Sequence, residues 1–335
     1  MLSPTPPAPL RARARRWFHA RRSLVRLNLA VSLMLLAAAP MAHAGQLRID
    51  VASDYFSPDT PTVNAGDQVV WIWTQGFHSV TSGIVDMGVT EIPDGIFDTG
   101  NVGTSAKSTF SWKAPATTGT IPYYCIPHGT YGMTATLAVV GSGQLMSSMR
   151  ITEVRWTAAH DQDFIEIANL GTAAGDLGYY RLSVTGSATQ TFALRDMPVP
   201  VNGRVVLRFN QSGANNAAQL FLPGLTLGPS GSAALYAPCT ISGETALTND
   251  KLMVDYVQWG TSGQQNETTA NVASYWATGT FVPAVADGHS IEFCGTTANR
   301  GSAFWNGSPT PTPGTVNCTT PAVSSTWGRV KALYR

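Results

Sequence analysis

Residues 124 to 133 read YCIPHGTYGM, and this stretch decides the fold. It places a thiol, an imidazole and a thioether, those of Cys125, His128 and Met133, within nine residues. The segments on either side have the apolar patterns of β-strands. Three donor side chains between two strands predict a metal-binding loop at one end of a β-sheet.

The donor types favour copper over other metals. A Cys thiolate donates strongly, imidazole suits copper in either oxidation state, and a weak axial Met completes the trigonal site that proteins use for electron transfer. Such a site needs a second imidazole, and His78 supplies it just after an apolar, strand-like run. Zinc is the chemical competitor, but structural zinc prefers several Cys and catalytic zinc keeps a position for water. We therefore expect one copper ion bound by His78, Cys125, His128 and Met133.

Residues 46 to 140 resemble a cupredoxin of the plastocyanin or pseudoazurin type. The resemblance rests on motifs in the family's order, which are Phe56-Ser57-Pro58, Val63 to Trp71, Phe97 to Gly100, Ser108 to Phe110 and the Cys-x2-His-x4-Met loop. It implies a Greek-key β-sandwich with one type 1 copper ion. In that family the second His of the loop, here His128, exposes its ring edge through an apolar patch and passes the electron. The residues that would surround it here are Pro127, Gly129, Tyr131 and Gly132.

Residues 1 to 44 predict a signal peptide. The first 26 residues contain seven Arg and no acid, the run from Leu27 to Ala39 is apolar but too short to span a bilayer, and Ala42-His43-Ala44 is a small-x-small cleavage signature. The processed chain would begin near Gly45, without a membrane span, in the periplasm or outside the cell. Arg21-Arg22 weakly resembles a twin-arginine signal, which leaves the export route open.

Removal of this segment reverses the sign of the net charge. Seven of the 21 Lys and Arg precede residue 45 but none of the 20 Asp and Glu do, so the formal charge changes from +1 to −6. Residues 45 to 140 alone carry −5, with three basic and eight acidic side chains. This acidity argues against binding to nucleic acid or to an anionic membrane, and it favours a redox partner protein with a basic surface.

A second β-domain is expected after a short connection at residues 141 to 148. Apolar stretches separated by Gly, Pro, Asn and Ser predict further strands; they are Met149–Val154, Phe164–Ile167, Val205–Phe209, Ala233–Tyr236 and Met253–Val257. No long helical period is present. Residues 149 to 318 resemble a lamin-tail domain, on the order of Ile151-Thr152-Glu153-Val154, Asp163 to Asn169, Asp176 to Leu182, Val254 to Gly260, Gly288 to Glu292 and Pro309 to Asn317. That resemblance implies an immunoglobulin-like β-sandwich that binds a protein or a surface.

The remaining cysteines and the C-terminal tail leave alternatives open. If Cys125 binds copper, three cysteines remain, which suggests one disulfide and one thiol in an oxidising compartment. We expect a bond that involves Cys294, with Cys239 or Cys318 as its partner. The tail at residues 319 to 335 could dock on the sandwich or bind a partner.

The histidine count separates electron transfer from enzymatic copper chemistry. Copper oxidases and nitrite reductases need additional His ligands for a second copper centre. After residue 44 the chain has four His, and His160 and His289 are the two not already assigned. We expect a non-enzymatic electron carrier, and the alternative is an exported copper-binding scaffold or adhesion protein that uses the lamin-tail-like region to bind its partner.

Overall fold

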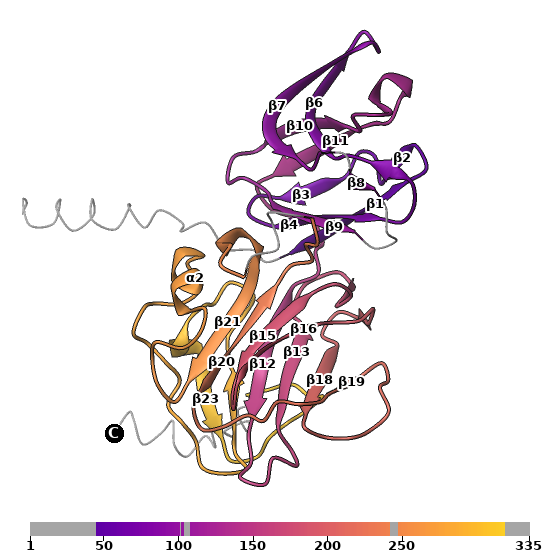
Figure 1. Ribbon diagram of the computed structural model, residues 1–335. Coiled ribbons are helices and arrows are strands. Elements are labelled where there is room, and N and C mark those ends of the chain that lie inside the picture. Colours follow the sequence, from indigo (N-terminus) through magenta and orange to yellow (C-terminus); the bar gives the residue numbers. More distant parts are fainter. Residues whose placement is uncertain (1–44, 101, 104–107, 242–246, 319–335) are drawn as a thin grey trace, which may run out of the picture. The chain divides into compact units, whose positions relative to one another are not determined.

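The computed structural model describes residues 45–100, 102–103, 108–241 and 247–318, and these form an all-β protein, as the sequence predicts (Figure 1). The predicted signal peptide and the C-terminal tail lie outside the described residues. Two groups of strands follow one another along the chain. We call β1 to β11 the first sandwich and β12 to β23 the second sandwich.

The first sandwich consists of two main sheets. Its strands are β1 (Gln46–Ala52), β2 (Tyr55–Ser57), β3 (Thr62–Asn64), β4 (Gln68–Trp73), β5 (Phe77–His78), β6 (Thr81–Asp86), β7 (Thr90–Asp98), β8 (Val102–Gly103), β9 (Thr109–Lys113), β10 (Gly119–Tyr124) and β11 (Thr134–Val140). One sheet has the order β2-β1-β4-β9 and the other β3-β11-β10-β6-β7, while β5 pairs with β8. The β1–β4 and β3–β11 pairs are parallel, and the other pairs are antiparallel.

Burial explains the strand patterns of this sandwich. All six residues of β4 are buried, which matches its continuous apolar sequence, whereas β11 alternates between more and less buried residues. The Trp71 ring from β4 contacts Phe110 at a centroid distance of 5.6 Å and Tyr123, from the opposite sheet, at 5.7 Å. This aromatic contact closes the core beneath the ends of the strands that carry the predicted ligands.

The second sandwich contains all five strands that the apolar pattern predicts. Its strands are β12 (Met149–Arg155), β13 (Phe164–Asn169), β14 (Gly175–Asp176), β15 (Arg181–Thr185), β16 (Thr189–Ala193), β17 (Pro198–Val199), β18 (Arg204–Phe209), β19 (Gln219–Leu222), β20 (Gly231–Tyr236), β21 (Met253–Trp259), β22 (Ser290–Phe293) and β23 (Trp305–Ser308). One sheet runs β19-β18-β13-β12-β22-β23 and the facing sheet runs β16-β15-β20-β21.

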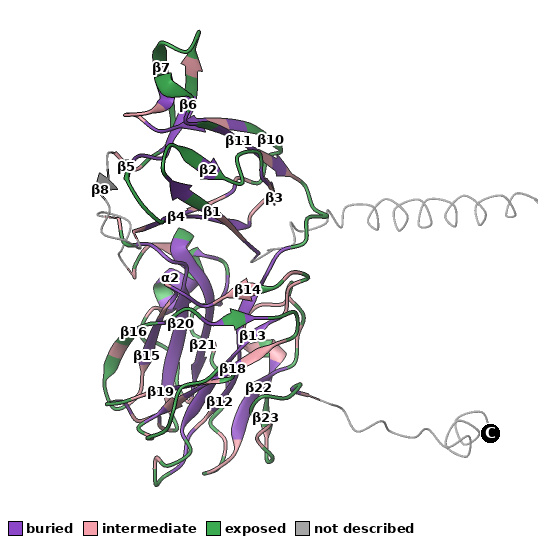
Figure 2. Ribbon diagram, turned by 90° about the vertical axis from the view of Figure 1, so that its right-hand side faces the viewer, coloured by how far each residue is buried: buried purple, intermediate pink, exposed green. Residues whose placement is uncertain are grey.

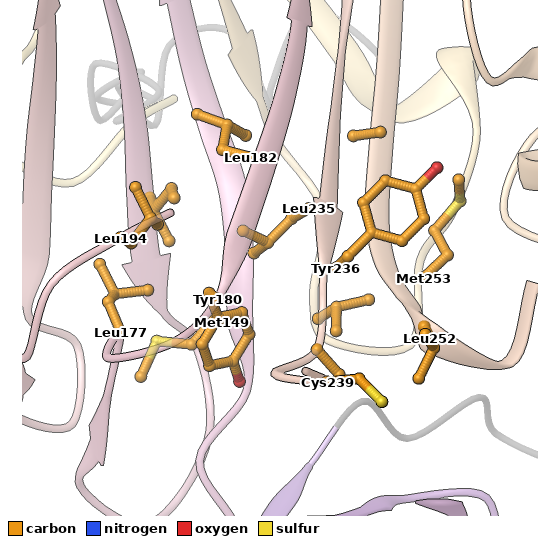
Figure 3. Close-up of a cluster of buried hydrophobic side chains, with 14 of the residues drawn as sticks. Met149, Leu177, Tyr180, Leu182, Leu194, Leu235, Tyr236, Cys239, Leu252 and Met253 are labelled. Carbon is orange, nitrogen blue, oxygen red and sulfur yellow. The ribbon is translucent and has the colours of Figure 1, made fainter. Parts of the chain in front are cut away.

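Leucine, methionine and tyrosine side chains fill part of the second core, where Leu182, Leu235 and Tyr236 are fully buried (Figure 3). The sequence pattern does not predict α2 (Glu267–Val272), a helix of six residues whose buried side includes Ala270. So short a helix offers too few turns for its period to be recognised. The remaining helical turns are η1 (Gly129–Tyr131), η2 (Asp250–Leu252) and η3 (Ser302–Phe304).

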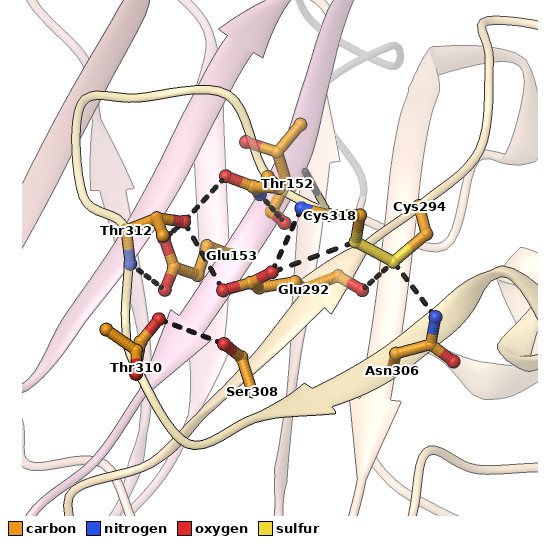
Figure 4. The surroundings of a disulfide bond; sticks show 10 residues. Thr152, Glu153, Glu292, Cys294, Asn306, Ser308, Thr310, Thr312 and Cys318 are labelled. Carbon is orange, nitrogen blue, oxygen red and sulfur yellow. Dashed lines mark hydrogen bonds between the residues drawn. A yellow bond between two sulfur atoms is a disulfide. The ribbon is translucent and has the colours of Figure 1, made fainter. Parts of the chain in front are cut away.

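A disulfide joins Cys294 and Cys318, which resolves the alternatives left by the sequence (Figure 4). The Cα atoms of the pair are 5.5 Å apart, within the range that a disulfide spans. Cys239 is a buried thiol of the second core. The disulfide holds the end of residues 309–318, which we call the closing segment, against strand β22.

The closing segment covers a row of three buried glutamates on neighbouring strands. Glu153 of β12 lies opposite Glu166 of β13 on one side and opposite Glu292 of β22 on the other. Backbone N–H groups of the segment donate to each carboxylate: Thr312 to Glu153 at 2.9 Å, Gly314 to Glu166 at 2.7 Å and Cys318 to Glu292 at 3.1 Å. The row is therefore satisfied by main-chain donors from one short segment.

Burial gives this row a pH-dependent effect on stability. Burial, followed by the repulsion of Glu166 and Glu292, raises the pKa of Glu153 from 4.5 to about 7. The folded state then binds a proton more tightly than the unfolded state, so this stabilisation is present below pH 4.5 and is lost as the pH rises through 7. We expect Glu153→Gln to reduce the fall in the free energy of unfolding between pH 5 and pH 8 by about 1–3 kcal/mol.

Urea unfolding at the two pH values measures this effect. Asp196→Asn, which changes an exposed acid of the same sandwich, should leave the pH dependence as it is in the parent chain. An unchanged pH dependence in Glu153→Gln would contradict the assignment to Glu153.

Candidate metal centre

Three of the four predicted ligands converge on one point. His78 Nδ1 lies 3.1 Å from His128 Nδ1 and 3.6 Å from Cys125 Sγ, and His128 Nδ1 lies 3.4 Å from the same sulfur. The point equidistant from the three atoms is roughly 2.0 Å from each, which is a metal–nitrogen distance and slightly short for metal–sulfur. Within the described part of the chain, these residues form the one His, Cys, Asp and Glu group of metal-binding dimensions.

Strand ends and a hydrogen-bonded turn place these side chains. His78 ends β5, and Cys125 follows directly after β10. The Cys125 carbonyl accepts from the His128 N–H at 3.1 Å and from the Gly129 N–H at 2.6 Å, which folds the loop back on itself. His128 therefore faces Cys125 because the main chain turns between them.

Met133, the fourth predicted ligand, closes the same loop through its main chain. Its N–H donates to the His128 carbonyl at 3.1 Å, and its carbonyl accepts from the Cys125 N–H at 3.1 Å. The Met133 side chain is 1% exposed. The loop therefore holds Met133 beside two of the converging residues, and its thioether as an axial ligand stays a prediction.

Ser79 fastens the two ligand loops together, a role that sequence reasoning missed. Its N–H donates to Cys125 Sγ at 3.4 Å, and its Oγ accepts from the Ile126 N–H at 2.7 Å. Ser79 Oγ also lies 3.0 Å from Thr81 Oγ1, which donates to Asp98 Oδ1 at 2.8 Å. This chain of contacts fixes the thiol relative to His78. Its position next to a predicted ligand is the one sequence signal that could have identified Ser79.

Gly76 provides the space that the His78 ring needs. A Cβ at this position would overlap His78 Nε2, and the backbone here has φ +84°, a value that favours glycine. Burial, followed by the proximity of His128, lowers the pKa of His78. The imidazole is thereby kept neutral, which is the form that binds a metal.

The buried thiol requires a metal to lose its proton readily. Burial raises the pKa of Cys125, although the Ser79 N–H opposes this shift by donating to the sulfur. A metal ion displaces the thiol proton when it binds, so metal affinity should rise with pH. The residues present thus fit a soft, thiophilic ion with two imidazole ligands.

His128 is the ligand that reaches the surface. Its side chain is 30% exposed, whereas His78 is 1% exposed. Its Nε2 lies 3.7 Å from Oδ1 of Asp54, an exposed acid that the sequence did not connect with the loop. Tyr131, predicted to surround this histidine, is 86% exposed.

The solved structures to which the chain is similar are copper proteins by their descriptions. They include a mutant plastocyanin of a fern, with 25% identity over 28% of this chain and 100% of that chain, at a TM-score of 0.22. A reduced amicyanin mutant has 22% identity over 29% and 83% of the two chains, at 0.22. A purple cupredoxin from Nitrosopumilus maritimus has 17% identity over 28% and 98%, at 0.23.

At these TM-scores the likeness carries no argument about function, and the case for a metal centre rests on the ligand geometry. No protein-family model matches the chain. No curated protein matches it either. In the part of the chain that the structure describes, no helix is long and apolar enough to cross a membrane.

Proposed function

We propose that the protein is an exported type 1 copper protein that carries single electrons and is not an enzyme. The observation that carries the proposal is the convergence of one thiol and two imidazoles at distances that fit one metal ion. Copper would supply one-electron chemistry there, with His78, Cys125 and His128 as the strong ligands and Met133 as the weak axial one. Ser79 and the turn after Cys125 keep these donors in place when the charge of the centre changes.

His128 is the proposed route for the electron. It joins the buried donors to the surface, and the hairpin of β6 and β7 lies beside its loop, since Val85 and Glu91 are neighbours of Gly129. Figure 2 shows β7 as largely exposed. Near the hairpin tip, Met87 is 90% and Val89 is 74% exposed.

Charge suggests the kind of partner that would approach His128. Residues 81–98 carry four acidic side chains, Asp86, Glu91, Asp94 and Asp98, and no Lys or Arg. Opposite charges speed the encounter of two proteins, while apolar contacts tolerate short-lived complexes. We therefore propose a redox partner protein whose docking surface combines basic and apolar side chains.

The visible spectrum of the purified protein tests this function. After addition of Cu(II), we expect strong visible absorption from charge transfer between Cys125 and the metal, with one copper bound per chain. A reductant should bleach the colour and reoxidation should restore it. A protein that binds copper but stays colourless would contradict a type 1 site.

A further inference from the structure

We propose that cleavage after Ala44 creates an α-ammonium group at Gly45 that forms a buried ion pair with Asp67. This inference rests on the proposed export, since the cleavage signature ends at Ala44. Water hydrolyses the peptide bond, Ala44 keeps the new carboxylate, and the Gly45 nitrogen takes up a proton to become an ammonium group. Processing would then complete an interaction of the first sandwich.

The nitrogen concerned already lies against the carboxylate. The Gly45 N–H donates to Asp67 Oδ1 at 2.8 Å, and this bond is buried. Asp67 is 0% exposed, and its Oδ2 accepts from Asn64 Nδ2 at 2.9 Å. Hydrolysis leaves the nitrogen on residue 45, so it converts a neutral donor into a charged one at the same atom. Hydrogen bonds between two charged groups are shorter and stronger than neutral ones.

The surrounding main chain holds Gly45 and Asp67 in register. The Gly45 carbonyl accepts from the Gln68 N–H at 2.8 Å, at the start of the parallel pairing between β1 and β4. The Asp67 carbonyl accepts from the Ala114 N–H at 2.9 Å. Loss of the first 44 residues removes none of these contacts, so the α-amino group stays at the carboxylate.

Residue 45 must also be a glycine. A Cβ at this position would lie 2.4 Å from the Met146 Cβ and 2.5 Å from an Asp67 oxygen, far inside contact distance. The one residue that packs here without a clash is therefore the residue that follows the cleavage signature. A larger first residue would push the α-ammonium away from Asp67.

The pair would also strengthen the connection to the second sandwich. Asn64, which donates to Asp67, also donates to the Gln144 carbonyl at 3.2 Å and accepts from the Gln144 N–H at 2.9 Å. Gln144 lies in the connection between β11 and β12. The new N-terminus, Asp67, Asn64 and the connection thus form one buried network, and such a network is strongest when every member is satisfied.

The test compares two forms of the chain from Gly45 to Arg335. One has a free α-amino group, and the other has it acetylated, which restores a neutral amide N–H at the same nitrogen. We expect the acetylated form to melt about 5 °C or more below the free form. Asp67→Asn should lower the melting temperature of the free form by a larger amount than that of the acetylated form.

Two controls make the outcome specific. Asp50→Asn changes an exposed acid of β1 and should have the same small effect in both forms. A chain that retains Ala44 has its ammonium group one residue away and should melt near the acetylated form. Equal melting temperatures of the free and acetylated forms would overturn the ion pair, even if Asp67→Asn does not fold.

The proposed export and copper functions are tested separately. N-terminal sequencing of the protein secreted by an expressing bacterium should give Gly45 as the first residue. Any other first residue would exclude the processing step, whereas the melting comparison and the copper spectrum do not depend on it.

Discussion

Replacing Cys125 by serine should abolish the visible absorption of the copper-loaded protein. The hydroxyl of serine cannot supply the soft thiolate that produces the charge transfer. Even the loss of a hydrogen-bond partner of a ligand weakens metal binding by about 10–100-fold, so loss of the thiolate should weaken copper binding by at least 100-fold. Copper titration followed by visible absorption measures both effects.

Cys239→Ser is the matched control for this prediction. Cys239 is likewise a buried thiol, but it belongs to the core of the second sandwich (Figure 3). This variant should keep the colour and the stoichiometry of the parent protein. Colour that persists in Cys125→Ser would show that the ligand set is wrong, and colour lost in Cys239→Ser would point to a different sulfur ligand.

Asp255→Asn should cause a large loss of stability in the second sandwich. The Asp255 carboxylate forms ion pairs with Arg150 at 2.9 Å and Arg300 at 2.8 Å, and all three side chains are less than 9% exposed. It also accepts from the Ile151 N–H at 2.8 Å. Burial lowers the pKa of Arg150, and the charge of Asp255 opposes this shift. The amide would leave two buried guanidinium groups without their counter-ion, which costs about 3–5 kcal/mol.

Urea unfolding followed by tryptophan fluorescence measures this loss. Asp161→Asn changes an exposed acid in the turn before β13, and its free energy of unfolding should stay within about 0.5 kcal/mol of the parent value. If Asp255→Asn behaved like that control, the two arginines would have to be compensated by their main-chain acceptors alone.

The sequence predicts the strands better than the contacts between them. Apolar runs such as the one in β4, and the five strand-like stretches of the second half, were sufficient because burial dictates their composition. The short strands β14 and β17 were not predicted, since two residues carry no period. The partner of Cys294 stayed open because the distance between Cα atoms, and not the order of the cysteines, decides which pair can bond.

The candidate site shows the same division. The sequence identifies the donors by their chemistry, and the structure brings His78, Cys125 and His128 together. The sequence does not identify Ser79 or Asp54, because a serine or an aspartate in a turn carries no signal of what it will contact. These contacts depend on how two distant loops meet.

The closing segment has a consequence for how the second sandwich can be combined with other domains. Its first strand, β12, lies inside a sheet of six strands, and the last described residues bond to the glutamates of β12, β13 and β22 (Figure 4). Both ends of the unit are thus anchored at the middle of the same sheet and not at an edge. A unit closed in this way can follow another folded domain after a connection of a few residues and still leave no ladder of unpaired strand groups where the chain enters or leaves it.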